Sequence, residues 1–189
     1  GVTSIGYTAF KGCSKLTEIT IPEAVTSIGG SAFYNCSSLT EVTIPEKVAS
    51  IESGAFSGCS GLIKVEMLSE TPPATLGSNA FENCNFVTAN KKGILVPVGK
   101  VEDYKGAAGW SSYADYITDG TPQVTEQPTD QTAQNGKTAT FSITAEGEGT
   151  LEYQWQVDKK KGTFENIANA TSSTYTISNV TKTYDGYKY

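Results

Sequence analysis

One arrangement of hydrophobic and polar positions recurs along the first half of the chain. Three segments of 23 residues begin at Val2, Val25 and Val48 and carry apolar side chains at equivalent places. A fourth unit keeps the same internal spacing, although its Phe81 follows Phe56 by 25 residues. A unit this short cannot bury its apolar stripe alone, so neighbouring units must stack and share one elongated core. The pattern predicts a solenoid.

Within each unit, one short stretch alternates apolar and polar residues with a period of two. These stretches cover residues 16–21, 39–44 and 62–67, and a proline, Pro22 or Pro45, ends the first two. Alternation of this kind indicates a strand with one buried face, and strands from stacked units form a parallel sheet. The polar positions then point outward as a regular row that a partner could bind. The candidate partner-binding residues are Glu18, Thr20, Glu41, Thr43, Lys64 and Glu66.

The repeated unit resembles a known family. Its Leu-x-x-Ile-x-Ile order is the leucine-rich-repeat signature, and the fuller unit is similar to the BspA-type leucine-rich repeats of bacterial surface proteins. The resemblance covers residues 2–118 and implies a mainly β solenoid, residues 1–120, with parallel strands on one side and short turns or helical segments on the other. Residues 93–117 look like the closing segment of such arrays, because large aromatic side chains suit an exposed core edge. Its expected anchors are Val96, Pro97, Tyr104, Trp110, Tyr113 and Ile117.

The four cysteines occupy one repeated position, three residues after the repeat phenylalanine. They are Cys13, Cys36, Cys59 and Cys84. Stacked coils would hold neighbours about 5 Å apart with parallel Cβ directions, which is poor disulfide geometry. We therefore expect four buried thiols that act as small hydrophobes. Because the four thiols would lie in a row along the solenoid axis, they could not surround one ion, so no metal site is expected.

The pattern changes after about residue 120. A stretch rich in Thr, Gln, Pro and Gly leads into short alternating segments, which is typical of a β-sandwich. Residues 121–189 resemble bacterial immunoglobulin-like domains, with Trp155 as the core tryptophan of strand C, Ile143 in place of the strand B cysteine and Tyr189 as the corner tyrosine of strand F. The resemblance implies a truncated immunoglobulin-like sandwich, incomplete at its C-terminus. We expect both ends of the chain to be cuts in a longer protein.

Composition excludes several classes of function. The chain of 189 residues has a net charge of −6, its 14 basic residues are all lysine, and it contains no histidine. Without an imidazole, histidine-dependent hydrolases and histidine-containing zinc sites are excluded, and a catalytic cysteine has no base. The acidic balance argues against nucleic acid, and no apolar run approaches the ~18 residues of a membrane span. Glu18 and Glu41 could stand about one strand spacing apart, but an open sheet face lacks the cleft of a glycosidase. We expect no catalytic residue, no cofactor and no membrane insertion.

Three functional hypotheses remain. The resemblance implies a bacterial cell-surface or secreted adhesion protein that binds a host matrix or bacterial surface protein through the repeat face, with the immunoglobulin-like domain as a spacer. The first alternative is a carbohydrate-binding module of a larger glycan-capture protein, which predicts exposed aromatic residues. The second is a purely structural stalk. Exposure of Tyr7, Tyr34, Trp110 and Tyr113 discriminates between protein and carbohydrate binding.

Overall fold

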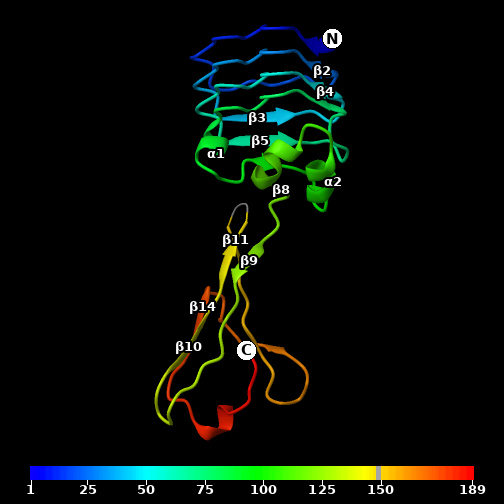
Figure 1. The fold of residues 1–189 in the computed structure, drawn as a ribbon. Helices are drawn as coiled ribbons and strands as arrows, with labels where there is room; N and C mark the ends of the chain where they lie inside the picture. The colour runs from blue at the N-terminus through cyan, green and yellow to red at the C-terminus, as the bar shows by residue number, and fades with distance from the viewer. Residues whose placement is uncertain (148–149) are drawn as a thin grey trace. The chain divides into compact units, whose positions relative to one another are not determined.

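The chain forms two compact units, residues Gly1–Gly120 and Thr121–Tyr189, in a computed structural model that describes residues 1–147 and 150–189 (Figure 1). The first unit is a stack of similar coils that runs from the N-terminal coil to a group of short helices. The second unit consists of short antiparallel strand pairs. The mainly β fold expected from the sequence is therefore confirmed.

Two parallel sheets run along the first unit. The first sheet joins β1 (Ser4–Ile5), β2 (Ser27–Ile28), β4 (Ser50–Ile51) and β6 (Thr75–Leu76). The second joins β3 (Glu41–Ile44), β5 (Lys64–Met67), β7 (Ile94–Leu95) and β8 (Ile117–Thr118). Equivalent residues of successive coils pair directly, as Ser4 does with Ser27 and Ser27 with Ser50. This register is what stacking of a repeated unit requires, and it confirms the leucine-rich-repeat solenoid.

The sequence prediction was wrong for one strand. Residues 16–21 were expected to form a strand like 39–44, but they have no regular secondary structure. They belong to the first coil, which has a neighbour on one side only, and no ladder hydrogen bond between them and β3 occurs in the part of the chain that the structure describes. Ile19 is consequently only half-buried, whereas its repeat equivalents Val42 and Val65 are buried.

The core of the first unit is a ladder of equivalent side chains. The rings of Phe10, Phe33, Phe56 and Phe81 stack with centroid separations of 5.1, 5.0 and 5.6 Å and nearly parallel planes. Main-chain bonds reinforce the stack, because the amide of Phe33 donates to the carbonyl of Ala55 in the next coil at 2.7 Å. Burial of a continuous apolar column is the main stabilising contribution in such a fold.

A cap of short helices closes the C-terminal end of this column. It is built from α1 (Asn85–Thr88), α2 (Val101–Gly106) and the 3-10 helix η1 (Ser111–Tyr116). The hydroxyl of Tyr113 accepts the amide hydrogen of Phe81 at 3.1 Å, and its ring meets Phe81 edge to face at 5.5 Å. Tyr113 thus replaces both the carbonyl and the ring that a further coil would supply. Trp110 is fully buried against Tyr104, at a centroid separation of 5.0 Å.

The described residues of the second unit, 121–147 and 150–189, form three antiparallel strand pairs and a short 3-10 helix. The pairs are β9 (Gln123–Glu126) with β11 (Thr144–Glu146), β10 (Ala139–Ser142) with β14 (Thr174–Ile177), and β12 (Gln156–Val157) with β13 (Glu165–Asn166), and the helix is η2 (Lys182–Tyr184). Trp155 is buried, as expected, and its indole donates to the carbonyl of Ser172 at 2.8 Å. It precedes β12 instead of lying within a strand. Ile143 is half-buried at the break between β10 and β11, which pair with different partners.

Candidate functional site

The second sheet of the solenoid presents a polar outer surface. In β3 and β5 the apolar side chains Val42, Ile44, Val65 and Met67 point into the core and are almost completely buried. Strand alternation therefore turns the intervening residues outward. We call these four residues, Glu41, Thr43, Lys64 and Glu66, the polar face.

The register of β3 and β5 sets how charges meet on the polar face. Glu41 is paired with Lys64, and Thr43 is paired with Glu66. The hydroxyl of Thr43 donates to a carboxylate oxygen of Glu66 at 3.4 Å. Glu41 and Thr43 are exposed, whereas Lys64 and Glu66 are half-buried. Carboxylate, hydroxyl and ammonium groups are thus held in a fixed array on rigid strands, which suits recognition of a polar partner.

The other two candidate residues lie outside this ladder. Glu18 and Thr20 are exposed, and they occupy in the first coil the repeat positions of Glu41 and Thr43. Because residues 16–21 form no strand, no strand register fixes Glu18 and Thr20 against their neighbours in the next coil. The structure therefore places four of the six candidate residues side by side and leaves two without strand support.

Two exposed apolar residues, which were not predicted from the sequence, flank the polar face. Ile63 and Leu68 lie at the two ends of β5 and are 50% and 48% exposed. A signal was present, because Ile63 stands where earlier repeats carry threonine, and Leu68 stands where they carry proline. An exposed apolar side chain at a position where the other repeats carry a different residue offers a partner apolar area to bury.

The aromatic residues chosen to discriminate between protein and carbohydrate binding divide into two groups. Trp110 and Tyr113 are buried in the cap, so they offer no surface for a sugar. Tyr7 is 75% exposed. Tyr34 is half-buried, and the ammonium group of Lys11 lies over its ring at 5.3 Å. The cap interpretation of the aromatic closing segment is therefore supported, and a row of exposed aromatics along the solenoid is not formed by these four.

The cysteine ladder carries no sign of nucleophilic or metal chemistry. All four thiols are free, and within residues 1–147 and 150–189 no three Cys, Asp or Glu side chains converge as metal ligands would. The thiol of Cys59 donates to the carbonyl of Phe33 at 3.1 Å, and burial raises its pKa to about 12. Burial also raises the pKa of the thiols of Cys36 and Cys84, which opposes formation of a thiolate.

The expectation of four buried thiols was wrong for one of them. Cys36, Cys59 and Cys84 are buried, but Cys13 is exposed because no coil covers its side of the first repeat in the structure.

This difference predicts selective alkylation. Under native conditions at pH 8, iodoacetamide is expected to modify Cys13 alone, because the other three thiols are inaccessible and remain protonated. Intact-mass spectrometry should show one adduct before denaturation and four after it. The variant Cys13→Ser should show none before denaturation. Rapid appearance of two or more native adducts would contradict a stacked ladder.

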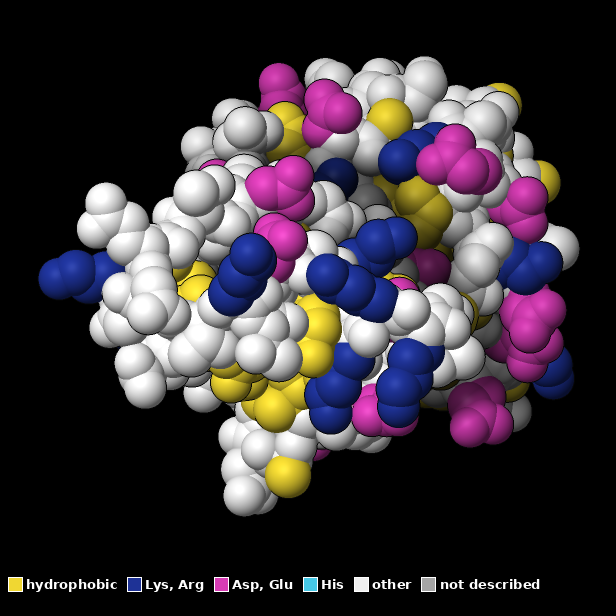
Figure 2. Space-filling model, turned by 90° about the horizontal axis from the view of Figure 1, so that it is seen from below, with side chains coloured by type: hydrophobic (Ala, Val, Ile, Leu, Met, Phe, Trp, Pro, Cys, Tyr) yellow, Lys and Arg dark blue, Asp and Glu magenta, His cyan; other side chains and the backbone are white. Residues whose placement is uncertain are grey.

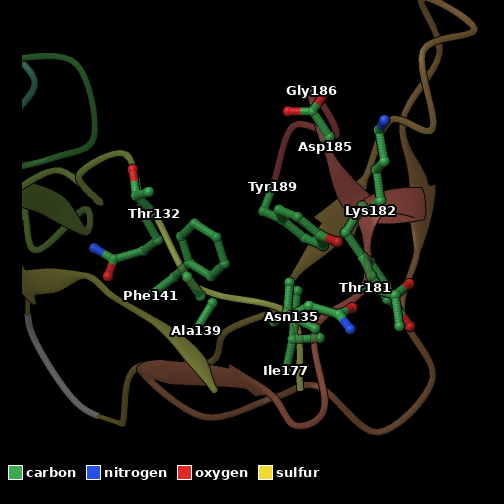
Figure 3. A pocket seen from close by; sticks show the side chains of 14 residues that line it. Thr132, Asn135, Ala139, Phe141, Ile177, Thr181, Lys182, Asp185, Gly186 and Tyr189 are labelled. Carbon is green, nitrogen blue, oxygen red and sulfur yellow. The ribbon is translucent and has the colours of Figure 1, made fainter. Parts of the chain in front are cut away.

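A cavity of about 340 Å³ opens in the second unit (Figure 3). The rings of Phe141 and Tyr189 form part of its wall, at a centroid separation of 4.9 Å. Lys182 and Asp185 reach it from the segment around η2. Burial, followed by the neighbouring tyrosines Tyr175, Tyr184 and Tyr187, raises the pKa of Tyr189 to about 12, so this phenol is not poised as a base at neutral pH.

One face of the molecule is polar and mixed in charge (Figure 2). On the face shown in Figure 2, lysine and carboxylate side chains are interspersed among uncharged polar ones, with small groups of hydrophobic side chains between them. Among the described residues, no helix combines the length and the apolar character needed to cross a bilayer.

Comparison with known proteins gives the class of the chain. A family model described as BspA type leucine rich repeat region, in 6 copies, matches residues 1–96, and an immunoglobulin domain model matches residues 121–189. The first match spans half of the chain, which therefore belongs to the BspA-type leucine-rich-repeat family, with an immunoglobulin-like domain after the repeats. Proteins of this type are typically found on the bacterial surface or are secreted, leucine-rich-repeat proteins generally bind other proteins, and both kinds of domain are typically non-enzymatic.

Two solved structures are similar to part of the chain. A leucine-rich-repeat protein from Bacteroides ovatus is 41% identical, with a TM-score of 0.40, over 50% of this chain and 24% of its own. A leucine-rich-repeat protein from T. pallidum is 22% identical, with a TM-score of 0.33, over 45% of this chain and 50% of its own. The chain thus spans about a quarter of the first protein and half of the second. No curated protein matches it.

Proposed function

We propose that the chain is a non-enzymatic binding protein of the bacterial surface or the secreted fraction. Its polar face recognises an extracellular protein, from a host matrix or from another bacterium, and the immunoglobulin-like domain serves as a spacer. The observation that carries the proposal is the register of β3 and β5, which holds Glu41 beside Lys64 and Thr43 beside Glu66 on an open sheet surface. Glu18 and Thr20 extend the same repeat positions into the first coil.

The energetics of the polar face suit a protein partner. Its charges lie on strands whose inner side chains are packed in the core, so the strand backbone is already ordered and little main-chain entropy is lost on binding. Ile63 and Leu68 supply apolar area at its two ends. In such an interface, burial of the apolar side chains contributes affinity, and the oriented charges contribute specificity.

Charge reversal on the polar face tests the proposal. The double variant Glu41→Lys and Glu66→Lys is expected to weaken binding to a panel protein at least about tenfold, because each reversed charge meets a partner group arranged for a carboxylate. The matched control is Glu23→Lys with Glu46→Lys, which makes the same change in net charge at two exposed positions outside the sheet. Surface plasmon resonance against immobilised matrix and bacterial surface proteins measures both.

The two variants separate a specific face from general electrostatics. Equal loss in both would show that the partner senses only net charge. Undiminished binding by the polar-face variant would place the site elsewhere. Binding to neutral glycans that is lost when Tyr7 is replaced by alanine would favour the carbohydrate alternative, because Tyr7 is the most exposed of the four discriminating aromatics.

A further inference from the structure

The lysines of the second unit gather at one of its ends. Six of the 14 lysines of the chain lie in residues 121–189, and all six are exposed. Three belong to one loop, Lys159, Lys160 and Lys161, and two belong to the last segment of the chain, Lys182 and Lys188. The sixth, Lys137, is tied to that segment because its carbonyl accepts the amide hydrogen of Val180 at 2.8 Å.

Main-chain and side-chain contacts bring the loop and the last segment together. Asp158 and Lys188 exchange two main-chain hydrogen bonds, at 2.8 and 3.1 Å. The Cα of Gly186 lies beside the end of the Lys160 side chain, since a Cβ there would come within 2.9 Å of its Cε. Lysines that are distant in sequence therefore share one surface, which we call the lysine end and define as Lys159, Lys160, Lys161, Lys182 and Lys188.

Carboxylates neutralise the lysine end only in part, and the exposed Asp185 stands between Lys182 and Lys188 in the sequence. The carboxylate of Asp158 is buried, and one of its oxygens accepts the amides of Lys161 and Gly162 at 2.7 and 3.1 Å. Glu165 pairs with Lys159 at 3.7 Å. Lys160, Lys161, Lys182 and Lys188 form no ion pair with any residue that the structure describes.

The acidic residues of the second unit lie at both of its ends, and Asp158, Glu165 and Asp185 are close to the lysine end. Glu126 and Glu146 belong to the β9–β11 pair, which lies at the opposite end of this unit from η2 (Figure 1). The lysine end is still net positive, with five lysines against three side-chain carboxylates, although the unit is acidic as a whole. Clustered exposed lysines in an otherwise acidic protein repel one another, and an anionic ligand relieves that repulsion.

Tyrosines adjoin the lysine end. Tyr184 and Tyr187 meet edge to face at 5.7 Å, and Tyr184 is 37% exposed. Together with Lys159, Glu165 and Asn166 they line a cavity of about 210 Å³, which has room for one ring-sized group. An aromatic ring with polar groups at its edge accepts the apolar face of a sugar while the polar groups bind its hydroxyls.

We propose that the lysine end binds an acidic polysaccharide, with ammonium groups on its carboxylates or sulfates and Tyr184 and Tyr187 against a sugar ring. The cavity lined by Tyr184 and Tyr187 favours this ligand over duplex DNA or a phospholipid surface, because a sugar ring can pack in it, whereas lysine alone binds phosphates, carboxylates and sulfates alike. This site is separate from the polar face of the solenoid, so either can fail without the other.

Titration calorimetry of the whole chain tests the proposal with heparin and polygalacturonate as probes. Both are expected to bind, and affinity should fall as salt rises because exposed charges are screened. The triple variant Lys160→Gln, Lys161→Gln and Lys182→Gln should weaken binding about tenfold. The matched control, Lys15→Gln, Lys47→Gln and Lys91→Gln, removes three exposed lysines of the solenoid and should change affinity less than about twofold.

Further arms identify the ligand class. Tyr184→Ala should weaken polygalacturonate binding several-fold if a sugar ring packs on it. Dextran, which is neutral, should not bind. The proposal is overturned if neither acidic polysaccharide binds at about 1 mM, an affinity that corresponds to about −4 kcal/mol. It is also overturned if the control variant loses as much affinity as the lysine-end variant, or if duplex DNA or phosphatidylglycerol vesicles bind as tightly as the polysaccharides.

Discussion

Replacing Phe56 with alanine is expected to lower the free energy of unfolding of the first unit by about 3–5 kcal/mol. Phe56 is fully buried, and its ring stacks on Phe33 at 5.0 Å and on Phe81 at 5.6 Å. Main-chain hydrogen bonds fix the spacing between neighbouring coils, so the coils cannot move into the space that the ring leaves. The variant therefore loses the free energy gained by burying the ring, and the side chains around the new cavity lose their van der Waals contacts with it.

Tryptophan fluorescence can measure this loss in the first unit alone. The chain has two tryptophans, Trp110 in the cap and Trp155 in the second unit, so a Trp155→Phe background leaves Trp110 as the reporter of solenoid unfolding in guanidinium. Ile63→Ala is the control, because its side chain is 50% exposed and should cost less than about 1 kcal/mol. A loss below about 1 kcal/mol for Phe56→Ala would contradict a continuous phenylalanine column.

Gly77→Ala is expected to destabilise the first unit by about 3 kcal/mol, even though alanine is small. Gly77 follows β6, and its amide donates to the carbonyl of Ile51 at 2.7 Å. A Cβ at this position would overlap the main-chain nitrogen of Ser53 in the preceding coil. Because the obstacle is backbone, relief requires the two coils to separate, which weakens the ladder on both sides.

A second glycine gives the matched control for this substitution. Gly106 is the last residue of α2, and no atom lies within 4 Å of the place where its Cβ would be. Gly106→Ala should therefore leave stability unchanged or raise it by up to about 1 kcal/mol. The guanidinium unfolding midpoints of Gly77→Ala and Gly106→Ala are measured under the same conditions, each in the Trp155→Phe background. Equal effects of the two alanines would show that close approach between coils at Gly77 is absent.

The parts of the fold that follow from repetition could be predicted from the sequence. A side chain that recurs every 23 residues, as Phe10, Phe33 and Phe56 do, must meet its own equivalents once the units stack. Closure by large aromatics was predictable for the same reason, since Tyr113 and Trp110 follow the last repeat and are buried. The phenylalanine column can be predicted because the same residue pattern recurs in every repeat unit.

Features that depend on position within the stack could not be predicted from the sequence. The first sheet is made of two-residue strands such as Ser27–Ile28, which are too short to show alternation. The exposure of Cys13 and the lack of a strand at 16–21 arise because the first coil has only one neighbour, although its sequence matches that of its buried counterparts. Identical residues thus differ in structure through their surroundings alone.

At the candidate site, the outward residues could be predicted from the sequence, but their neighbours on the sheet could not. Alternation alone identified Glu41, Thr43 and Glu66 as outward positions. The register added that Glu41 meets Lys64, and side-chain exposure added Ile63 and Leu68. The partner itself is not encoded in any local pattern, because a binding face is defined by complementarity to a second molecule.

The most direct test of the proposed recognition face is hydrogen–deuterium exchange of the chain with and without a matrix or bacterial surface protein that binds it. The proposal predicts slower exchange at amides of residues 39–44 and 62–68, with no change in residues 121–189. Slowing confined to the first sheet or to residues 121–189, with the β3 and β5 segments unaffected, would contradict it.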